Sequence, residues 1–192
     1  MPAIIVVFPP GAGGNHLRNV VFSCYVDSDQ IVKLYKKFKL TVHQKIGCNL
    51  QLQEVEEAVA NQDQTHVLHG HFGEIMSFQN QIRSITDKKF IILSPDSAED
   101  RMLLSARRQT LKHKSFPDKD YFDQEQVFLY EPFMYYWYFQ TPMDHIMNIS
   151  ISDWFTKDID AVLDKLSYFL KLPINKEETN VNHASWVEAN KL

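Results

Sequence analysis

The chain has 192 residues, of which 44% are hydrophobic and 23% are charged. This length and balance predict one soluble domain, spanning 1–192, that buries a core of its own. The formal net charge of -4 gives no overall attraction for nucleic acid or for an acidic membrane surface. Neither is therefore an expected partner, and any anion site must be local.

The two cysteines, Cys24 and Cys48, have no metal-type spacing, which favours free thiols in a reducing compartment. The apolar N-terminal run carries no basic residues and is interrupted at Pro9, so it is too short for a secretion signal or a membrane span. A cytoplasmic location is therefore predicted.

Four short apolar segments have the character of strands, and they cover 3–8, 65–68, 88–93 and 144–150. Helices are predicted between and after them, at 15–25, 28–40, 50–61, 74–86, 98–111 and 159–170. Residues 112–126 are polar and contain a proline, which predicts an exposed loop. Strands that alternate with helices predict the α/β class, with three αβα layers around a mostly parallel central sheet.

Three of the six glycines lie in the run Gly11-Ala12-Gly13-Gly14, between the first predicted strand and the first predicted helix. Glycine permits positive φ and lets main-chain N–H groups converge on an anion at the positive end of a helix. Asn15 is a candidate N-cap, and His16 or Arg18 would add positive charge. The run therefore predicts a site for a phosphate-bearing nucleotide. The alternative is a tight strand-to-helix connection that binds nothing.

The glycine run is not a Walker A motif, which ends in Gly-Lys-Ser/Thr. Here the corresponding residues include no lysine to neutralise phosphate and no hydroxyl to hold magnesium. Both groups are needed for ordinary nucleoside triphosphate hydrolysis. A nucleotide or small-molecule kinase of the P-loop type is disfavoured for the same reason.

The segment from Pro10 to Leu17 resembles the loop Pro-Lys-Ser-Gly-Thr-Thr-Trp-Leu of sulfotransferases that use 3′-phosphoadenosine 5′-phosphosulfate, and Pro10, Gly13 and Leu17 match it. Three later segments are similar to further elements of the same family in the same order, at 67–72, at 90–105, and at 149–154 followed by 166–173. The resemblance implies a divergent member with a P-loop NTPase/sulfotransferase-like fold. It also implies the phosphosulfate nucleotide as co-substrate, no metal, and a small-molecule or glycan hydroxyl as acceptor.

The resemblance also implies roles for individual residues. His71 corresponds to the general base, and Ser105 to a serine that binds the 3′-phosphate. The 5′ end of the nucleotide would be held by Gly11, Ala12, Gly13, Gly14, Asn15 and His16.

Two departures from the family pattern leave activity open. Gly11 stands where the family has a lysine that stabilises the leaving group, and no arginine stands in the expected register before Ser105. Arg101, Arg107 or Arg108 would supply that charge, or would simply solvate a helix face. The alternative function is a catalytically silent nucleotide-binding or scaffold protein of the same fold.

His69 and His71 lie two residues apart at the end of a predicted strand, so their side chains should share one face. Histidine titrates near neutral pH and suits removal of a proton from a hydroxyl. We expect His71 to act as base and His69 to orient substrate or phosphate, with Gly70 allowing close approach. A metal site that adds His66 is disfavoured because His66 faces away. The remaining alternative is that these histidines only cap the strand.

The stretch 128–139 is unusually aromatic. A helix packed against the sheet is the favoured interpretation, ahead of an acceptor-pocket wall. If it is exposed, it would be a contact between two copies of the chain. Residues 182–186 either fold over the nucleotide or form a loose tail.

Overall fold

A computed structural model describes residues 3–24, 50–110, 119–156 and 158–189. Its centre is a sheet of four parallel strands in the order β2-β1-β3-β4. The strands are β1 (Ala3–Val7), β2 (Val67–Gly70), β3 (Lys88–Ser94) and β4 (Ile146–Ser150). The predicted α/β class and parallel sheet are confirmed, although β2 begins two residues later than the sequence suggested.

β1 lies in the middle of the sheet and is buried along its whole length. Alternate side chains of a strand point to opposite faces, so this one strand contributes to two cores. Ile4 and Val6 belong to one apolar cluster, and Ile5 and Val7 belong to the other. A strand covered on both faces requires a continuous Ile and Val run, which is what the sequence provides.

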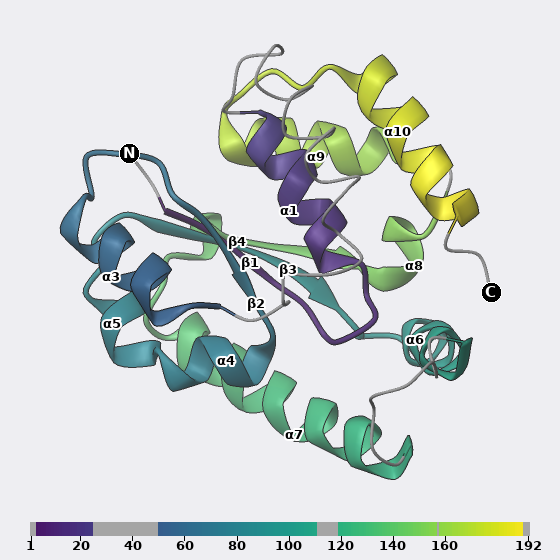
Figure 1. Cartoon of the computed structure of the whole chain (residues 1–192), viewed down its shortest axis with the longest axis horizontal. Coiled ribbons are helices and arrows are strands. Elements are labelled where there is room, and N and C mark those ends of the chain that lie inside the picture. The colour runs from purple at the N-terminus through teal and green to yellow at the C-terminus, as the bar shows by residue number, and fades with distance from the viewer. Residues whose placement is uncertain (1–2, 25–49, 111–118, 157, 190–192) are drawn as a thin grey trace.

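Helices cover both faces of the sheet, as in a three-layer αβα arrangement (Figure 1). One face carries α1 (Gly14–Ser23), α8 (Ile151–Trp154), α9 (Asp160–Leu170) and α10 (Lys176–Ala189). The other face carries α3 (Leu52–Ala60), α4 (Phe72–Ser77), α5 (Gln79–Arg83) and α7 (Lys119–Tyr138). Beyond the carboxyl ends of the strands lies α6 (Ala98–Thr110), and a short 3-10 turn, η1 (Met143–His145), precedes β4.

Several predicted boundaries are corrected by the structure. The helix predicted at 74–86 is two short helices, α4 and α5, which meet at Phe78. The loop predicted at 112–126 is wrong in its second half, because α7 begins at Lys119. The helix predicted at 28–40 lies outside the described residues.

The aromatic stretch forms the second half of α7, and its packing against the sheet is confirmed. Phe133 and Trp137 are fully buried against β3, where both rings contact Phe90. Tyr135, on the opposite side of the helix, and Phe139, directly after its end, are exposed. The stretch is therefore mainly a core element with one exposed side.

None of the helices in the described ranges combines the length and apolar character needed to cross a bilayer. Cys24, at the end of α1, is a free thiol, and burial raises its pKa to about 11.

Candidate functional site

The parallel strands bring four chain segments to one edge of the sheet. Each segment directly follows the carboxyl end of a strand: the turn after β1, His71 after β2, the 95–97 loop after β3 and helix α8 after β4. β1 and β3 are neighbours, and the strands that follow them in the chain, β2 and β4, lie toward opposite edges of the sheet. In open α/β sheets the crevice at such a point is where ligands bind. A ligand site is therefore expected at this edge.

The turn after β1 is built around two glycines with left-handed backbone, Gly11 (φ 87°) and Gly13 (φ 76°). The N–H of Ala12 donates to the carbonyl of Pro9 at 3.1 Å. The N–H groups of Gly11, Gly13 and Gly14 donate to no protein atom in the described ranges. Since the turn opens directly into α1, these amides lie where a helix favours an anion.

α1 begins at Gly14 and its N-cap is Gly13, so the prediction of Asn15 as N-cap is wrong. Asn15 lies in the first turn of the helix instead. Ala12 is buried in the core on the α1 face. The residues predicted to bind the nucleotide in this loop therefore lie next to one another at the start of α1. They offer a ligand mainly main-chain N–H groups rather than side chains.

The glycines are also required by packing. A Cβ atom on Gly14 would overlap the ring of Phe8, and one on Gly13 would overlap the indole of Trp186. Aromatic rings therefore press against the main chain of the turn from two sides. Both predicted interpretations, a ligand-binding turn and a tight connection, find support in this geometry.

His69 and His71 share one face, as predicted, because both rings contact Phe8. The ring of His69 stacks on Phe8 with centroids 6.3 Å apart, and that of His71 meets it edge-on at 5.0 Å. Phe8 precedes the glycine turn by two prolines. The two histidines therefore lie beside the start of that turn.

His71 is held in one tautomer by the main chain. Its Nδ1 lies 3.1 Å from the carbonyl oxygen of Phe8, and its own main-chain N–H donates to the carboxylate of Glu74 at 2.9 Å. A carbonyl only accepts, so Nδ1 carries the hydrogen and Nε2 of the neutral ring keeps its lone pair. His71 is half-buried, which suits a group that must meet a substrate.

His69 has a different environment from its neighbour. It is 2% exposed, and its Nδ1 lies 3.5 Å from the guanidinium of Arg18 on α1. Burial, together with the charges of Arg18 and His71, lowers the pKa of His69 to about 4. The imidazole is therefore neutral at pH 7 and acts there through hydrogen bonds only.

The structure does not support close substrate approach at Gly70. The space that a Cβ would occupy there is already bounded by Glu74, Leu50 and Ile75 at 3.1 to 3.4 Å. His66 lies at the opposite end of β2, where its Nε2 contacts the carbonyl of Asn61 at 3.0 Å. It does not join His69 and His71, and no group of three metal-ligating side chains is found among the described residues.

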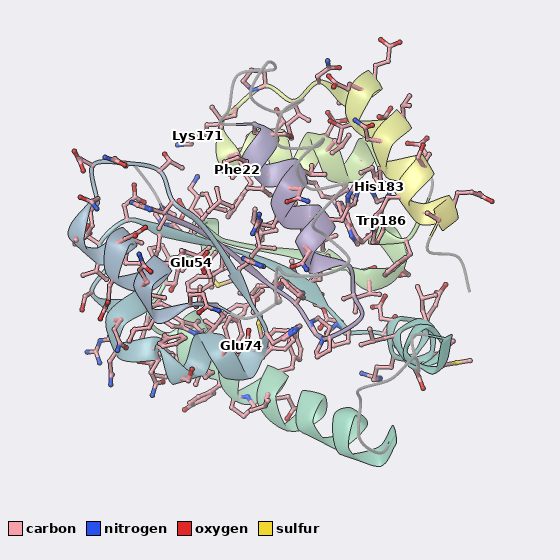
Figure 2. The ribbon with its side chains drawn as sticks, in the orientation of Figure 1. Phe22, Glu54, Glu74, Lys171, His183 and Trp186 are labelled. Carbon is pink, nitrogen blue, oxygen red and sulfur yellow. The ribbon has the colours of Figure 1, made fainter. Side chains whose placement is uncertain are left out.

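The side chain of His16 is uncharged at neutral pH. Its ring stacks on Trp186 at 4.5 Å with an interplanar angle of 7°, and its Nε2 lies 3.2 Å from Nδ1 of His183. Figure 2 shows His183 and Trp186 extending from α10 toward α1. Burial, with a smaller contribution from His183, lowers the pKa of His16 to about 3. The prediction that His16 adds positive charge is therefore wrong at neutral pH.

Residues 182–186 are part of α10, so the loose tail is excluded. They lie against the glycine turn, since Trp186 packs on Gly13, and Nε2 of the fully buried His183 lies 3.0 Å from the carbonyl oxygen of Thr156. No sequence signal identified this cluster, because its members are far apart in the chain.

The residues predicted for the 3′-phosphate lie on α6. Arg101 is exposed, and its guanidinium donates to the carbonyls of Pro95 and Asp96, both at 3.3 Å. Ser105 is half-buried one turn further along the same helix. Arg101 thus steadies the loop after β3, at the same sheet edge as the glycine turn. The side chains of Arg107 and Arg108 lie outside the described structure.

One buried carboxylate at this edge was missed by the sequence reasoning. Asp100 is 1% exposed and accepts hydrogen bonds from the main-chain N–H groups of Ser152 (2.7 Å) and Ser97 (3.1 Å). Burial alone would raise the pKa of Asp100, but these hydrogen bonds outweigh it and lower the pKa. The carboxylate fastens α8 to the start of α6.

In comparisons with known proteins, no family model, no curated protein and no solved structure matched this chain.

Proposed function

We propose that this chain is a P-loop-type, sulfotransferase-like protein that binds 3′-phosphoadenosine 5′-phosphosulfate at the glycine turn and transfers its sulfuryl group to a hydroxyl acceptor. The observation that carries the proposal is the closeness of the glycine-turn N–H groups and His71. The N–H groups of Gly11, Gly13 and Gly14, which have no protein partner in the described ranges, lie at the start of α1, and His71 is tied to the same turn through Phe8.

The arrangement of the sheet supports this proposal. The first strand lies between two others and leads directly through a glycine turn into a helix. Such a turn offers main-chain donors and the positive end of a helix dipole to phosphate oxygens. The sequence resemblance implies the nucleotide, and the main-chain N–H groups at the start of α1 support the proposal that its charged end binds there.

The tautomer of His71 supports the role of base. With Nδ1 donating to the Phe8 carbonyl, Nε2 takes the proton of the acceptor hydroxyl as the acceptor oxygen attacks sulfur. The sulfur–oxygen bond to the 5′-phosphate then breaks. The bonding electrons leave with adenosine 3′,5′-bisphosphate, so atoms and charge balance.

The glycine at position 11 sets an expectation for the rate. A lysine there would stabilise charge on the departing phosphate, and loss of one such donor costs about a hundredfold or more. We therefore expect slow turnover. In this proposal the protein acts in the cytoplasm, and Ser105 and Arg101 bind the 3′-phosphate of the nucleotide. Arg101 would release the carbonyls of Pro95 and Asp96 to do so.

A nucleotide-binding or scaffold protein without catalysis is the second candidate. It is favoured by Gly11 and by the packing of Phe8 and Trp186 against the turn. In this case the fold would keep the anion site and lack turnover.

Calorimetric titration with adenosine 3′,5′-bisphosphate, and with ATP in parallel, tests the proposal. Binding of the bisphosphate in preference to ATP is the expected result. If neither ligand binds, the nucleotide site is refuted and only the scaffold candidate remains.

Transfer of labelled sulfate from the co-substrate to a panel of hydroxyl acceptors tests catalysis. We expect turnover to fall about a hundredfold or more in His71→Ala. The matched control is His66→Ala, at the far end of the same strand, and it should keep wild-type turnover. Equal turnover in the His71 variant would remove this residue as base.

A further inference from the structure

Two tryptophans carry buried indole N–H groups without a hydrogen-bond partner in the described structure. They are Trp137, which is 1% exposed, and Trp154, which is fully buried. A buried indole N–H usually finds an acceptor, since leaving it unpaired costs free energy. Each of the two therefore requires an explanation from its surroundings.

The surroundings of the two indoles differ. Trp137 lies among the rings of Phe90, Phe133 and Tyr136 on the α7 face of the sheet. Nε1 of Trp154, in contrast, lies 3.4 Å from the point where a Cβ on Gly13 would stand. Gly13 is the N-cap of α1. The unpaired indole donor thus lies beside main-chain donors that are also without protein partners.

Trp154 is held firmly in this place. It ends α8, whose N-cap, Ser150, accepts a hydrogen bond from the N–H of Asp153 at 3.1 Å. The N–H of Ser152 in the same helix donates to the buried carboxylate of Asp100 at 2.7 Å. The first bond caps the short helix and the second ties it to α6, so the indole is preorganised to donate its N–H to a ligand.

We propose that Trp154 is a further binding residue of the glycine-turn site, whose indole N–H donates to an oxygen of the phosphate or sulfate group held there. This inference rests on the proposed function, because the anion is taken to be the charged end of the nucleotide. Two independent features of the described structure converge on one place, namely the start of α1 and a fully buried donor with no partner.

The chemistry of this site selects its ligand class. Main-chain amides and an indole only donate hydrogen bonds, and the nearby His16 is uncharged at neutral pH. Such a site suits a fully ionised tetrahedral oxyanion that has no proton to give. Trp186 packs on Gly13 as well.

NMR of the indole N–H groups in the full ¹⁵N-labelled chain tests this directly. The chain has three tryptophans, so three indole resonances are assigned with single Trp→Phe variants. The protein is titrated separately with adenosine 3′,5′-bisphosphate, inorganic sulfate and inorganic phosphate. We expect the Trp154 indole signal to shift downfield, and that of Trp137 to stay in place.

Affinity provides the second measurement. Trp154→Phe should weaken bisphosphate binding about tenfold or more, which is the size of a lost hydrogen bond to a charged group. The matched control is Trp137→Phe, which removes an equally buried and unpaired indole and should leave affinity within about twofold.

The outcomes separate this inference from the proposed function. If the bisphosphate binds while the Trp154 signal stays in place, the inference is overturned and the nucleotide site stands. Unchanged affinity in a folded Trp154→Phe variant would have the same meaning. If none of the three anions binds the wild-type chain, both proposals fail. Should the variant not fold, the wild-type titration decides alone.

Discussion

The two faces of the sheet both pack aromatic rings, but they differ in what those rings contact. The α7 face packs Phe90, Phe133 and Trp137 into a core, and the α1 face packs Trp154, His183 and Trp186. In the described ranges, each face contains buried rings and one buried indole without a hydrogen-bond partner, Trp137 on the α7 face and Trp154 on the α1 face. Of the two faces, the α1 face brings its rings against N–H groups of the glycine turn that have no protein partner in those ranges.

Aromatic content alone therefore does not point to the candidate site in this protein. The aromatic stretch of α7 is more conspicuous in the sequence, yet its buried rings fill space between α7 and β3. What distinguishes the α1 face is the left-handed turn, where the N–H groups of Gly11, Gly13 and Gly14 have no protein partner among the described residues.

Phe133→Ala should destabilise the protein by about 3–5 kcal/mol, because it removes a fully buried ring from the α7 core. The matched control is Tyr135→Ala on the exposed side of the same helix, with an expected change within about 0.5 kcal/mol. Guanidinium unfolding of both variants measures this. Equal losses at the two positions would show that α7 does not pack as described.

Gly14→Ala should destabilise by about 1–3 kcal/mol, because the new methyl group would overlap the ring of Phe8. Gly73→Ala, on the other face, is the control. Its Cβ would meet only the end of the Leu129 side chain at 3.2 Å, and alanine is the better helix former. The contrast between the α1 turn and α4 breaks down if urea unfolding gives Gly14→Ala the smaller cost.

Acid should destabilise the α1 face before most carboxylates titrate. Burial lowers the pKa of His16 from 6.5 to about 3, so the unfolded chain binds a proton between these values that the folded chain does not. Stability is therefore complete above pH 6.5 and falls as the pH drops toward 3, by at most about 1.4 kcal/mol per pH unit for this residue.

The measurement is the free energy of unfolding at several pH values between 7 and 4, for the wild type and for His16→Gln. The variant should show the shallower slope. His69, whose pKa is lowered to about 4, keeps part of the dependence in both proteins. Identical slopes would mean that His16 is not buried as a neutral ring.

Tyr130→Phe should have the smallest effect, about 0.5–1.5 kcal/mol, because it removes one hydrogen bond near the surface. The hydroxyl of Tyr130 on α7 donates to the carboxylate of Asp96 at 2.5 Å, and this bond joins α7 to the loop after β3. A double-mutant cycle with Asp96→Asn isolates the pair. A coupling energy of zero would show that α7 and this loop are held only by apolar contacts.

Much of the fold could be predicted because its signals are local. The Ile and Val run of β1 and the apolar spacing in α9 each reflect a few neighbouring residues and one buried face. The break between α4 and α5 could not be predicted from such spacing. It depends on how Phe72 and Ile75 from α4 and Ile82 from α5 enter the same core.

The sequence alone determined that a strand, a left-handed glycine turn and a helix follow one another at the start of the chain, since glycine is needed where φ is positive. The tertiary structure alone decided what surrounds that turn. His16 and His183 meet across 167 residues, and Trp186 and Trp154 flank Gly13 from other elements. Local patterns carry no information about such contacts, because they form only when distant helices pack on one sheet. Burial in that packing makes His16 neutral and leaves the indole of Trp154 beside the turn.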